Sequence, residues 1–387
     1  MKKLAIITTH PIQYYAPVFK LLQERGKIEI NVFYTWGTAA IEKFDPGFSK
    51  SINWDIPLLE GYPYEWVQNT AADKGSHHFK GIVNPDLIQQ IKDWQPNAIL
   101  VYGWAYKSHL KSIRYFKNRI PVFFRGDSTL LNKQSTLKNL VRSIFLKWVY
   151  KHVDHAFYVG TNSKAYFKKY GLKEEQLTFA PHSIDNVRFM DNDESKALKL
   201  RTSLNIGKDD ILILYAGKFE AIKNINILLN AFIAINNPHT HLLLAGNGIE
   251  ELSLKNRAQQ SSLSENIHFL DFQNQSYMPI LYQAADLLCL PSLSETWGLA
   301  VNEAMACSKA VLVSDQVGAA TDLVEQGFNG AIFKAQSLES LTGALYQLIR
   351  LGKKELINLG ANSKKIINNW TFQKQAEAIE AKVLKHD

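Results

Sequence analysis

The sequence contains little cysteine: Cys289 and Cys307 are the two it has, and both lie in apolar segments. Two such cysteines exclude a disulfide framework and zinc-finger spacing, so we expect a cytoplasmic chain. Long hydrophobic runs are missing as well. No stretch approaches the roughly 20 apolar residues of a membrane-spanning helix, and the run after Lys2 and Lys3 is too short for a signal peptide. We therefore expect any membrane contact to be peripheral, at the inner face.

Acidic residues are fewer than basic ones, with 36 Asp and Glu against 44 Lys and Arg, which gives a formal net charge of +8. A basic balance favours an anionic partner such as a phosphorylated ligand or an anionic membrane. The basic residues are spread along the chain, and the sequence carries no nucleic-acid-binding motif. We therefore expect no nucleic-acid partner.

Short apolar runs alternate with amphipathic stretches along most of the chain, which predicts parallel sheets built from right-handed βαβ units. The polar run Asp191–Asp210 interrupts this alternation. We therefore expect two doubly wound, Rossmann-like domains, at residues 1–190 and 191–387, with the last helix packing back on the first domain. In such folds, ligands bind at the carboxyl ends of the strands, here facing a central cleft.

The expected strands are Leu4–Thr8, Ile28–Tyr34, Ala98–Tyr102, Pro121–Phe124, His155–Gly160, Leu177–Pro181, Ile211–Ala216, His241–Ala245, Ile267–Leu270, Asp286–Leu290, Ala310–Ser314 and Ala331–Phe333. The expected helices include Tyr15–Gln23, Ser108–Lys117, Leu137–Tyr150, Asn224–Ile235, Glu250–Gln259, Met278–Ala284, Gly298–Cys307 and Leu338–Leu351. The segment Trp36–Lys80 has no clear period but many aromatic residues, which is typical of a functional loop rather than disorder.

Two glycine turns follow strands in the second half. In GKFEAIK, Gly217 is followed by Lys218 and Lys223, a pattern that suits a phosphate as well as a solvated loop. In LLLAGNG, Gly246 and Gly248 allow a tight turn. Each signal is weak by itself.

The stretch SETWGLAVNE places Glu295 before an expected helix and Glu303 inside it, among small apolar residues. The first amides of that helix, at Gly298 and Leu299, suit a diphosphate. A buried carboxylate needs partners, because burial of an unpaired charge costs several kcal/mol. Either the protein supplies those partners, as in a satisfied core glutamate, or the hydroxyl groups of a ligand do.

From Ile211 to Phe333 the sequence resembles the retaining glycosyltransferases of family 4, which have the GT-B fold. The resemblance is carried by GKFEAIK, LLLAGNG, LYQAADLLCLPS, the Glu-x7-Glu pair Glu295 and Glu303, and GAATDLVEQGFNG from Gly318. It implies a hexosyltransferase that uses a nucleotide sugar and acts on a glycan or a lipid-linked glycan, in the synthesis of bacterial surface polysaccharide or lipopolysaccharide. A sugar-nucleotide epimerase of the same fold and a non-catalytic sugar-nucleotide binder are the alternatives.

The resemblance also assigns roles to residues. Glu295, Lys218 and Lys223 are the implied catalytic residues, with the lysines neutralising the diphosphate and Glu295 orienting the donor sugar. Glu303 is implied to hold the ribose hydroxyls. The other implied donor-binding residues are Gly217, Gly246, Gly298, Leu299 and Gln273.

The first half resembles the family less closely. APHSIDNVRF, from Ala180 to Phe189, is similar to its interdomain signature, and HPIQY is similar to the first loop of some members. Arg125, in VFFRGDS, stands where many members have a histidine. The implied acceptor-side residues are Arg125, Asp127 and His10, although a loop histidine can also be purely structural.

No metal ion and no other cofactor are expected. The DND run at Asp191–Asp193 is similar to the Asp-x-Asp of metal-dependent transferases, but it lies in the polar run, and GT-B enzymes neutralise the diphosphate with cationic groups.

The stretch Leu130–His152 combines Lys133, Lys138, Arg142, Lys147 and Lys151 with a stripe of Leu137, Val141, Ile144, Phe145 and Trp148. This pattern fits a helix that lies on an anionic membrane, and it also fits a helix packed on its sheet. If the helix lies on a membrane, the acceptor is lipid-linked and Trp36–Lys80 contacts its sugars.

Overall fold

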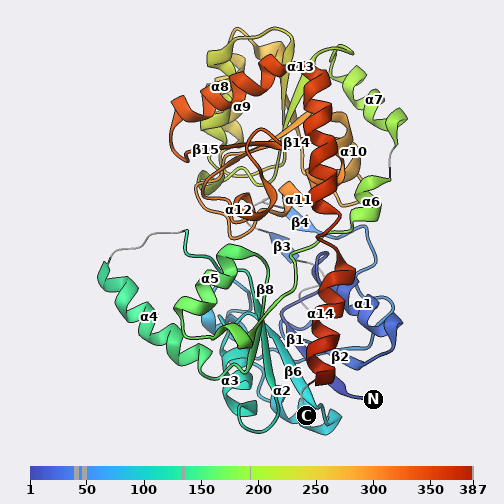
Figure 1. Ribbon diagram of the computed structural model, residues 1–387, viewed down its shortest axis with the longest axis vertical. Helices are drawn as coiled ribbons and strands as arrows, with labels where there is room; N and C mark the ends of the chain where they lie inside the picture. The colour runs from blue at the N-terminus through green and yellow to red at the C-terminus, as the bar shows by residue number, and fades with distance from the viewer. Residues whose placement is uncertain (39–42, 46–49, 132–135, 192, 386–387) are drawn as a thin grey trace. The chain divides into compact units, whose positions relative to one another are not determined.

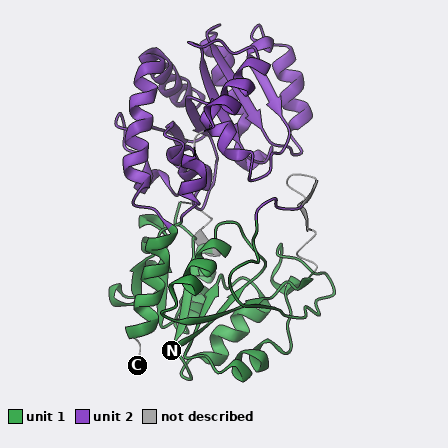
Figure 2. Ribbon diagram, turned by 90° about the vertical axis from the view of Figure 1, so that its right-hand side faces the viewer, with its two compact units in different colours: residues 1–43, 57–182, 372–387 green, residues 44–56, 183–371 purple. Residues whose placement is uncertain are grey.

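The computed structural model describes residues 1–38, 43–45, 50–131, 136–191 and 193–385. The chain forms two compact units (Figure 2). Unit 1 comprises Met1–Lys43, Pro57–His182 and Phe372–Asp387, and unit 2 comprises Phe44–Ile56 and Ser183–Thr371. The change of unit at His182 therefore precedes the expected boundary after residue 190, and the last helix belongs to unit 1.

Unit 1 is built on a parallel sheet of seven strands in the order β5-β2-β1-β6-β7-β8-β9 (Figure 1). The strands are β1 (Lys3–Thr8), β2 (Glu29–Tyr34), β5 (Tyr64–Trp66), β6 (Ala98–Tyr102), β7 (Val122–Gly126), β8 (His155–Tyr158) and β9 (Leu177–Phe179). Its helices are α1 (Ala16–Arg25), α2 (Leu87–Trp94), α3 (Lys107–Phe116), α4 (Thr136–Tyr150), α5 (Thr161–Lys169) and α14 (Phe372–Lys385), with short 3-10 turns η2 (Phe79–Gly81) and η3 (Glu174–Gln176).

Both faces of this sheet are covered, as its continuous apolar strands predict. In β1, Leu4 and Ile6 pack with α1 and α14, while Ala5 and Ile7 pack with α2, α3, α4 and α5 on the other face. The period-2 alternation of a strand therefore feeds two separate cores.

Strand β5 was not expected, because the segment Trp36–Lys80 shows no period. Tyr62 and Trp66 instead pack around Tyr34, with the hydroxyl groups of Tyr34 and Tyr62 2.6 Å apart. Tyr62 and Trp66 therefore pack in or against the core at the edge of the sheet. A short pair of strands, β3 (Lys43–Asp45) and β4 (Lys50–Ile52), also lies in this segment, and part of the segment falls outside the described residues.

Unit 2 contains a parallel sheet of six strands in the order β12-β11-β10-β13-β14-β15. The strands are β10 (Ile211–Ala216), β11 (Thr240–Ala245), β12 (Ile267–Leu270), β13 (Leu287–Leu290), β14 (Ala310–Ser314) and β15 (Gly330–Phe333). The helices are α6 (Asn186–Met190), α7 (Glu194–Ser203), α8 (Ile225–Ile235), α9 (Glu251–Gln259), α10 (Met278–Ala284), α11 (Leu299–Ala306), α12 (Ala320–Leu323) and α13 (Leu338–Ile367), with 3-10 turns η4 (Ala221–Lys223) and η5 (Ser264–Asn266).

The polar run Asp191–Asp210 is not a simple linker, because it contains helix α7. Asp193 caps that helix by accepting a hydrogen bond from the Lys196 amide. Arg201 is buried and donates to the carbonyl of Ala284 and the carboxylate of Asp286, at 2.9 and 3.0 Å. Hydrophobic periodicity alone misses such a helix, because a guanidinium anchors it to the core.

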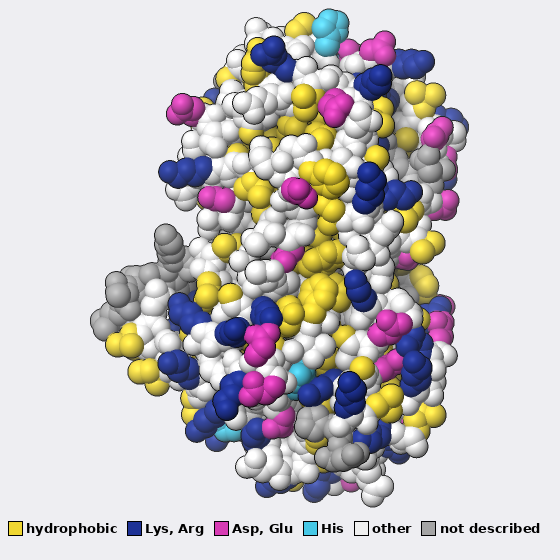
Figure 3. Space-filling view, in the orientation of Figure 1, with side chains coloured by type: hydrophobic (Ala, Val, Ile, Leu, Met, Phe, Trp, Pro, Cys, Tyr) yellow, Lys and Arg dark blue, Asp and Glu magenta, His cyan; other side chains and the backbone are white. Residues whose placement is uncertain are grey.

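Helix α4 exposes more apolar surface than a helix packed on its sheet would. Its C-terminal half is anchored by buried Leu146, Val149 and Tyr150. Four apolar side chains before this anchor are exposed: Leu140, Val141, Ile144 and Phe145. Hydrophobic side chains gather at the lower left of the space-filling view, where Figure 1 places α4 (Figure 3). Among the described residues, no helix is long and apolar enough to cross a membrane.

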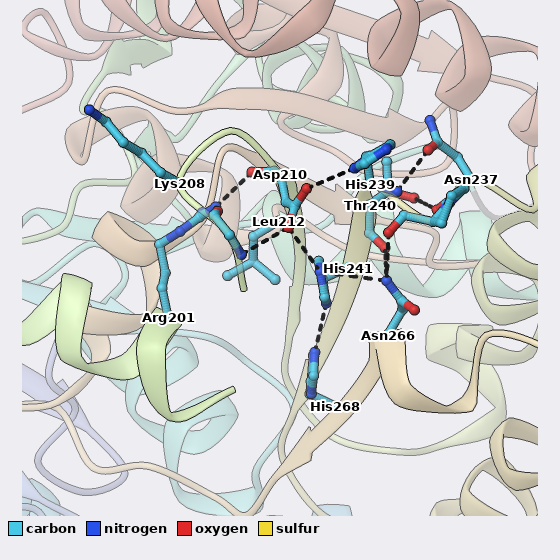
Figure 4. Close-up of polar contacts among 12 residues, drawn as sticks. Arg201, Lys208, Asp210, Leu212, Asn237, His239, Thr240, His241, Asn266 and His268 are labelled. Carbon is cyan, nitrogen blue, oxygen red and sulfur yellow. Dashed lines mark hydrogen bonds and ion pairs between the residues drawn. The ribbon is translucent and has the colours of Figure 1, made fainter. Parts of the chain in front are cut away.

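A polar cluster lies at the amino ends of the unit 2 strands (Figure 4). His241 of β11 stacks on His268 of β12, with Nδ1 and Nε2 3.0 Å apart, and Asp210 lies 3.5 Å from His241 Nε2. Burial lowers the pKa of His241, and burial together with His241 lowers the pKa of His268 to about 4. These surroundings therefore favour the neutral form of both imidazoles.

Candidate active site

The two glycine turns predicted after β10 and β11 pack directly against each other. The Gly217 amide donates to the Ala245 carbonyl at 3.0 Å, and the Phe219 amide donates to the Asn247 carbonyl at 2.9 Å. Gly246 has φ of 147°, and a Cβ there would lie 1.9 Å from the Gly217 carbonyl oxygen. Glycine is therefore required for the contact between these loops, whatever ligand they bind.

The lysine at the end of the first loop meets the first glutamate of the Glu-x7-Glu pair. Lys223 Nζ forms an ion pair with Glu295 Oε2, and both side chains are about one-fifth exposed, at 22% and 19%. The Leu293 amide donates to the Ile222 carbonyl at 2.8 Å, which ties the loop before α11 to the loop after β10. Two segments 72 residues apart thus bring opposite charges together at the carboxyl ends of β10 and β13.

Lys218 lies in the same loop and is half-buried. The hydroxyl group of Tyr215 donates to the Lys218 carbonyl at 2.7 Å and so fixes the backbone of the loop. Burial and the nearby carboxylate of Glu295 raise the pKa of Tyr215 well above its ordinary value. Tyr215 therefore remains a hydrogen-bond donor beside the candidate site.

The segment between β13 and α11 is held in place by the loop that follows β14. The Glu295 amide donates to the Gln316 carbonyl at 3.1 Å, and the Gly318 amide donates to the Glu295 carbonyl at 3.0 Å. Gly298 has φ of 96°, and a Cβ there would lie 2.9 Å from Val317 Cγ1. Helix α11 begins at Leu299, so the amides of its first turn face away from the helix body at this edge of the sheet.

Glu303 is nearly fully buried, at 3% exposure. The hydroxyl group of Tyr282, from α10, donates to Glu303 Oε2 at 2.7 Å. The protein therefore supplies at least one hydrogen-bond partner for this carboxylate. This agrees with the first of the two alternatives, in which Glu303 is a core glutamate whose partners come from the protein.

Gln273 follows β12 and is half-buried. Its amide group donates to the Asp271 carbonyl at 3.0 Å. The neighbouring Asn247, in the second glycine turn, donates to the carboxylates of Glu251 and Asp271 at 2.9 and 3.1 Å. These contacts fix the loops after β11 and β12 to each other.

Unit 1 has a cavity of about 500 Å³ at the carboxyl ends of β1, β6 and β7. Its lining includes the aromatic residues Tyr15, Tyr102, Trp104, Tyr106 and Tyr166. The predicted acceptor-side residues Arg125 and Asp127 line it, as does Arg142 of α4. His10 contacts the lining residue Thr9, with Nδ1 2.8 Å from its hydroxyl oxygen, and its ring lies edge-on to Trp36.

Arg125 is buried and forms hydrogen bonds with the backbone of its own unit. It is 2% exposed, and its guanidinium donates to the carbonyls of Ala180 and Pro181 at 2.8 and 3.0 Å. Burial lowers its pKa, and burial together with Arg125 lowers the pKa of the neighbouring His182 to about 4. Arg125 therefore anchors the chain where it leaves unit 1, in addition to lining the cavity.

Sequence reasoning missed several groups of the site, among them Tyr282, Ser292 and Tyr215. The hydroxyl oxygen of Ser292 lies 3.4 Å from Glu295 Oε2. Tyr282 and Ser292 fall inside the motif LYQAADLLCLPS. The motif points to this part of the site, but the resemblance assigns no role to its individual side chains.

The part of the chain that carries these loops matches a known family. Residues 197–366 match the family model of Glycosyl transferases group 1, so the chain carries a domain of this kind. The chain is similar to D-inositol 3-phosphate glycosyltransferase of Rhodococcus erythropolis, with 25% identity over 226 residues, covering 56% of this chain and 50% of that protein. An uncharacterized glycosyltransferase of Methanocaldococcus jannaschii is 31% identical over 134 residues, 34% of each chain. The aligned parts thus span about half or less of these relatives.

Solved structures extend the likeness to the whole fold. HepE of Anabaena, in complex with UDP and glucose, matches with a TM-score of 0.73 at 18% identity and covers 100% of both chains. Sucrose-phosphate synthase of Thermosynechococcus elongatus matches with a TM-score of 0.75 at 18% identity, covering 100% of this chain and 99% of that one. The fold is therefore GT-B, with two parallel-sheet, Rossmann-like units.

Proposed function

We propose that the chain is a retaining family 4 glycosyltransferase that moves a hexose from a nucleotide sugar to a glycan or lipid-linked glycan, in bacterial surface polysaccharide synthesis. The observation that carries this proposal is the Lys223–Glu295 ion pair, which joins the loop after β10 to the loop before α11. A UDP-sugar is the first donor to test, because the similar HepE structure contains UDP.

In this proposal, the diphosphate lies against Lys218, Lys223 and the first amides of α11. Negative charge grows on the diphosphate as the glycosidic bond breaks, so fixed positive groups act mainly in the transition state. Binding of the diphosphate would draw Lys223 from Glu295 and leave that carboxylate for the hydroxyls of the donor sugar. Glu303, with one oxygen held by Tyr282, would accept hydrogen bonds from the ribose.

The same lysines supply the charge that a metal ion supplies in other transferases, so we propose that transfer needs no metal. Transfer that persists in EDTA would support this statement. Loss of transfer in EDTA, with recovery in Mg²⁺ or Mn²⁺, would contradict it.

The donor is best found by a thermal-shift screen of nucleotide sugars, followed by radiolabelled donor with extracted membrane lipid or oligosaccharide.

Two variants test the site itself. Lys223→Ala and Glu303→Gln should each lower turnover by about 10²–10³-fold while the protein stays folded. Lys196→Ala is the matched control, because it removes a lysine that pairs with Asp193 at 2.8 Å on α7. Near-normal turnover in both site variants would refute the assignment. Isomerised or merely retained donor would indicate an epimerase or a binder.

We further propose that the acceptor is lipid-linked and that unit 1 docks on an anionic membrane through α4. Three of its apolar side chains are at least 59% exposed: Leu140, Val141 and Ile144. Lys147 and Lys151 are exposed on the same segment, so apolar insertion and attraction to anionic lipid act together. Lys133 lies outside the described residues, and the side chain of Lys138 is likewise not described.

Flotation with liposomes of phosphatidylglycerol tests the docking. Wild-type protein should float at low salt, and the variant Val141→Ser, Ile144→Ser, Lys147→Glu should not. The control variant Leu198→Ser, Ile357→Ser removes apolar side chains of similar exposure, 62% and 60%, from unit 2 and should float normally. If wild-type protein ignores these liposomes, or the α4 variant floats equally well, the helix has no docking role.

A further inference from the structure

Three potential metal ligands converge in the loop that precedes η2 in unit 1. Asp73, His77 and His78 each offer one ligand atom, and these atoms all lie within 4.8 Å of one another. His77 Nε2 and His78 Nε2 lie 3.3 and 3.2 Å from the same oxygen, Asp73 Oδ2. Among the described residues, no other group of His, Cys, Asp and Glu meets in this way.

Both spacings between the imidazole nitrogens and the carboxylate oxygen suit a tetrahedral ion. Zinc binds imidazole nitrogen at about 2.0–2.1 Å and carboxylate oxygen at about 2.0–2.2 Å, so two ligand atoms of a tetrahedral site lie roughly 3.3–3.5 Å apart. The two nitrogen–oxygen distances, 3.3 and 3.2 Å, are at or just below that value. Two imidazoles and one carboxylate also match the ligand types that zinc prefers over magnesium or calcium.

Backbone and glycine contacts fix the loop that carries these ligands. The Gly75 amide donates to the Gly81 carbonyl at 3.1 Å, which closes the loop around His77 and His78. A Cβ on Gly75 would lie 2.4 Å from His77 Nδ1, and a Cβ on Gly81 would lie 2.1 Å from the Gly75 carbonyl oxygen. The side chain of buried Asn69 bonds to Gly81, with its amide group 2.9 Å from the carbonyl oxygen. The loop is therefore built compactly and presents its histidines at the surface.

We propose that Asp73, His77 and His78 form a binding site for a divalent transition-metal ion, with Zn²⁺ as the best fit and water as the fourth ligand. The site belongs to unit 1, whereas the proposed donor-binding groups belong to unit 2. We assign the ion the role of fixing this loop. The loop also supports the aromatic cavity, because the hydroxyl group of Tyr106, a lining residue, donates to the Ser76 carbonyl at 3.1 Å.

Zinc binding can be measured on the whole chain, prepared without a histidine tag and stripped of metal. In competition with a chromophoric chelator, wild-type protein should bind one equivalent of Zn²⁺. The double variant His77→Gln, His78→Gln should weaken binding by at least about 100-fold. His239→Gln is the matched control, since this exposed histidine contacts a single carboxylate oxygen, Asp210 Oδ1, at 3.3 Å.

Limited proteolysis gives a second readout. Lys74 and Lys80 are exposed on either side of the two histidines, so Zn²⁺ should slow tryptic cleavage at these lysines in wild-type protein but not in the double variant. Asp73→Asn serves if the double variant does not fold, and it should also lose binding and protection. Wild-type protein that binds no Zn²⁺, or a double variant that binds it equally well, would overturn the proposal.

Discussion

The hydrogen bond from Tyr282 to Glu303 allows a quantitative test of how the buried carboxylate is held. The substitution Tyr282→Phe removes the hydroxyl group alone and keeps the ring, which packs on Phe189 with centroids 5.8 Å apart. The bond is 2.7 Å long and ends on a carboxylate that is 3% exposed. Hydrogen bonds to charged groups contribute about 1.5–3 kcal/mol, so we expect the free energy of unfolding of unit 2 to fall by about 2 kcal/mol.

Urea unfolding followed by tryptophan fluorescence is a suitable assay, because Trp297 and Trp370 pack together in unit 2 with ring centroids 5.0 Å apart. The control Tyr346→Phe removes the hydroxyl group of a half-exposed tyrosine on α13 and should change stability by less than about 0.5 kcal/mol. In the cycle of Tyr282→Phe with Glu303→Gln, the two effects should not add, because both act on one bond. A loss below about 0.5 kcal/mol for Tyr282→Phe would refute the reasoning.

Three further predictions follow from buried groups and close backbone contacts. Burial lowers the pKa of His109 to about 4, so its NMR titration midpoint should lie well below 6.5, and a midpoint above 6 would contradict this. The lowered pKa of His268 means that the unfolded chain binds the proton more readily, so stability should be lost as pH falls from about 6.5 towards 4. Replacing His268 by Gln should flatten that pH dependence of the melting temperature. Gly246→Ala should cost about 3 kcal/mol or more in thermal unfolding, whereas Gly343→Ala, in an open helical position, should stabilise slightly.

Much of the fold was predictable, because strands buried on both faces leave continuous apolar runs. The ranges of β6, β10, β12 and β14 match their expected ranges, and α13 changes direction at Gly352, next to the expected helix end at Leu351. Elements anchored by polar or aromatic side chains were not predictable. Helix α7 depends on the contacts of buried Arg201, and strand β5 depends on aromatic packing around Tyr34.

The sequence predicts which loops carry the candidate site. It does not predict which side chains of those loops contact one another. Motif order places Gly217, Gly246 and Glu295 at the carboxyl ends of strands, where the structure has them. The pairing of Lys223 with Glu295 could not be inferred, because it depends on how two loops 72 residues apart are joined through their backbones. The same is true of Arg125, whose carbonyl partners lie 55 and 56 residues further along the chain.

The two glutamates of the pair differ in a way that bears on their proposed roles. Glu295 is one-fifth exposed and paired with Lys223. In the proposed function the diphosphate attracts this lysine, so the surroundings of Glu295 would change when the donor binds. Glu303 is buried and accepts a hydrogen bond from the hydroxyl group of Tyr282. A carboxylate with one oxygen fixed in this way has a set orientation before any hydroxyl group reaches it, and preorganised groups lose less freedom on binding. Under the proposed function, this arrangement therefore suits Glu303 for recognition of a part of the donor that does not react, and Glu295 for the part that does.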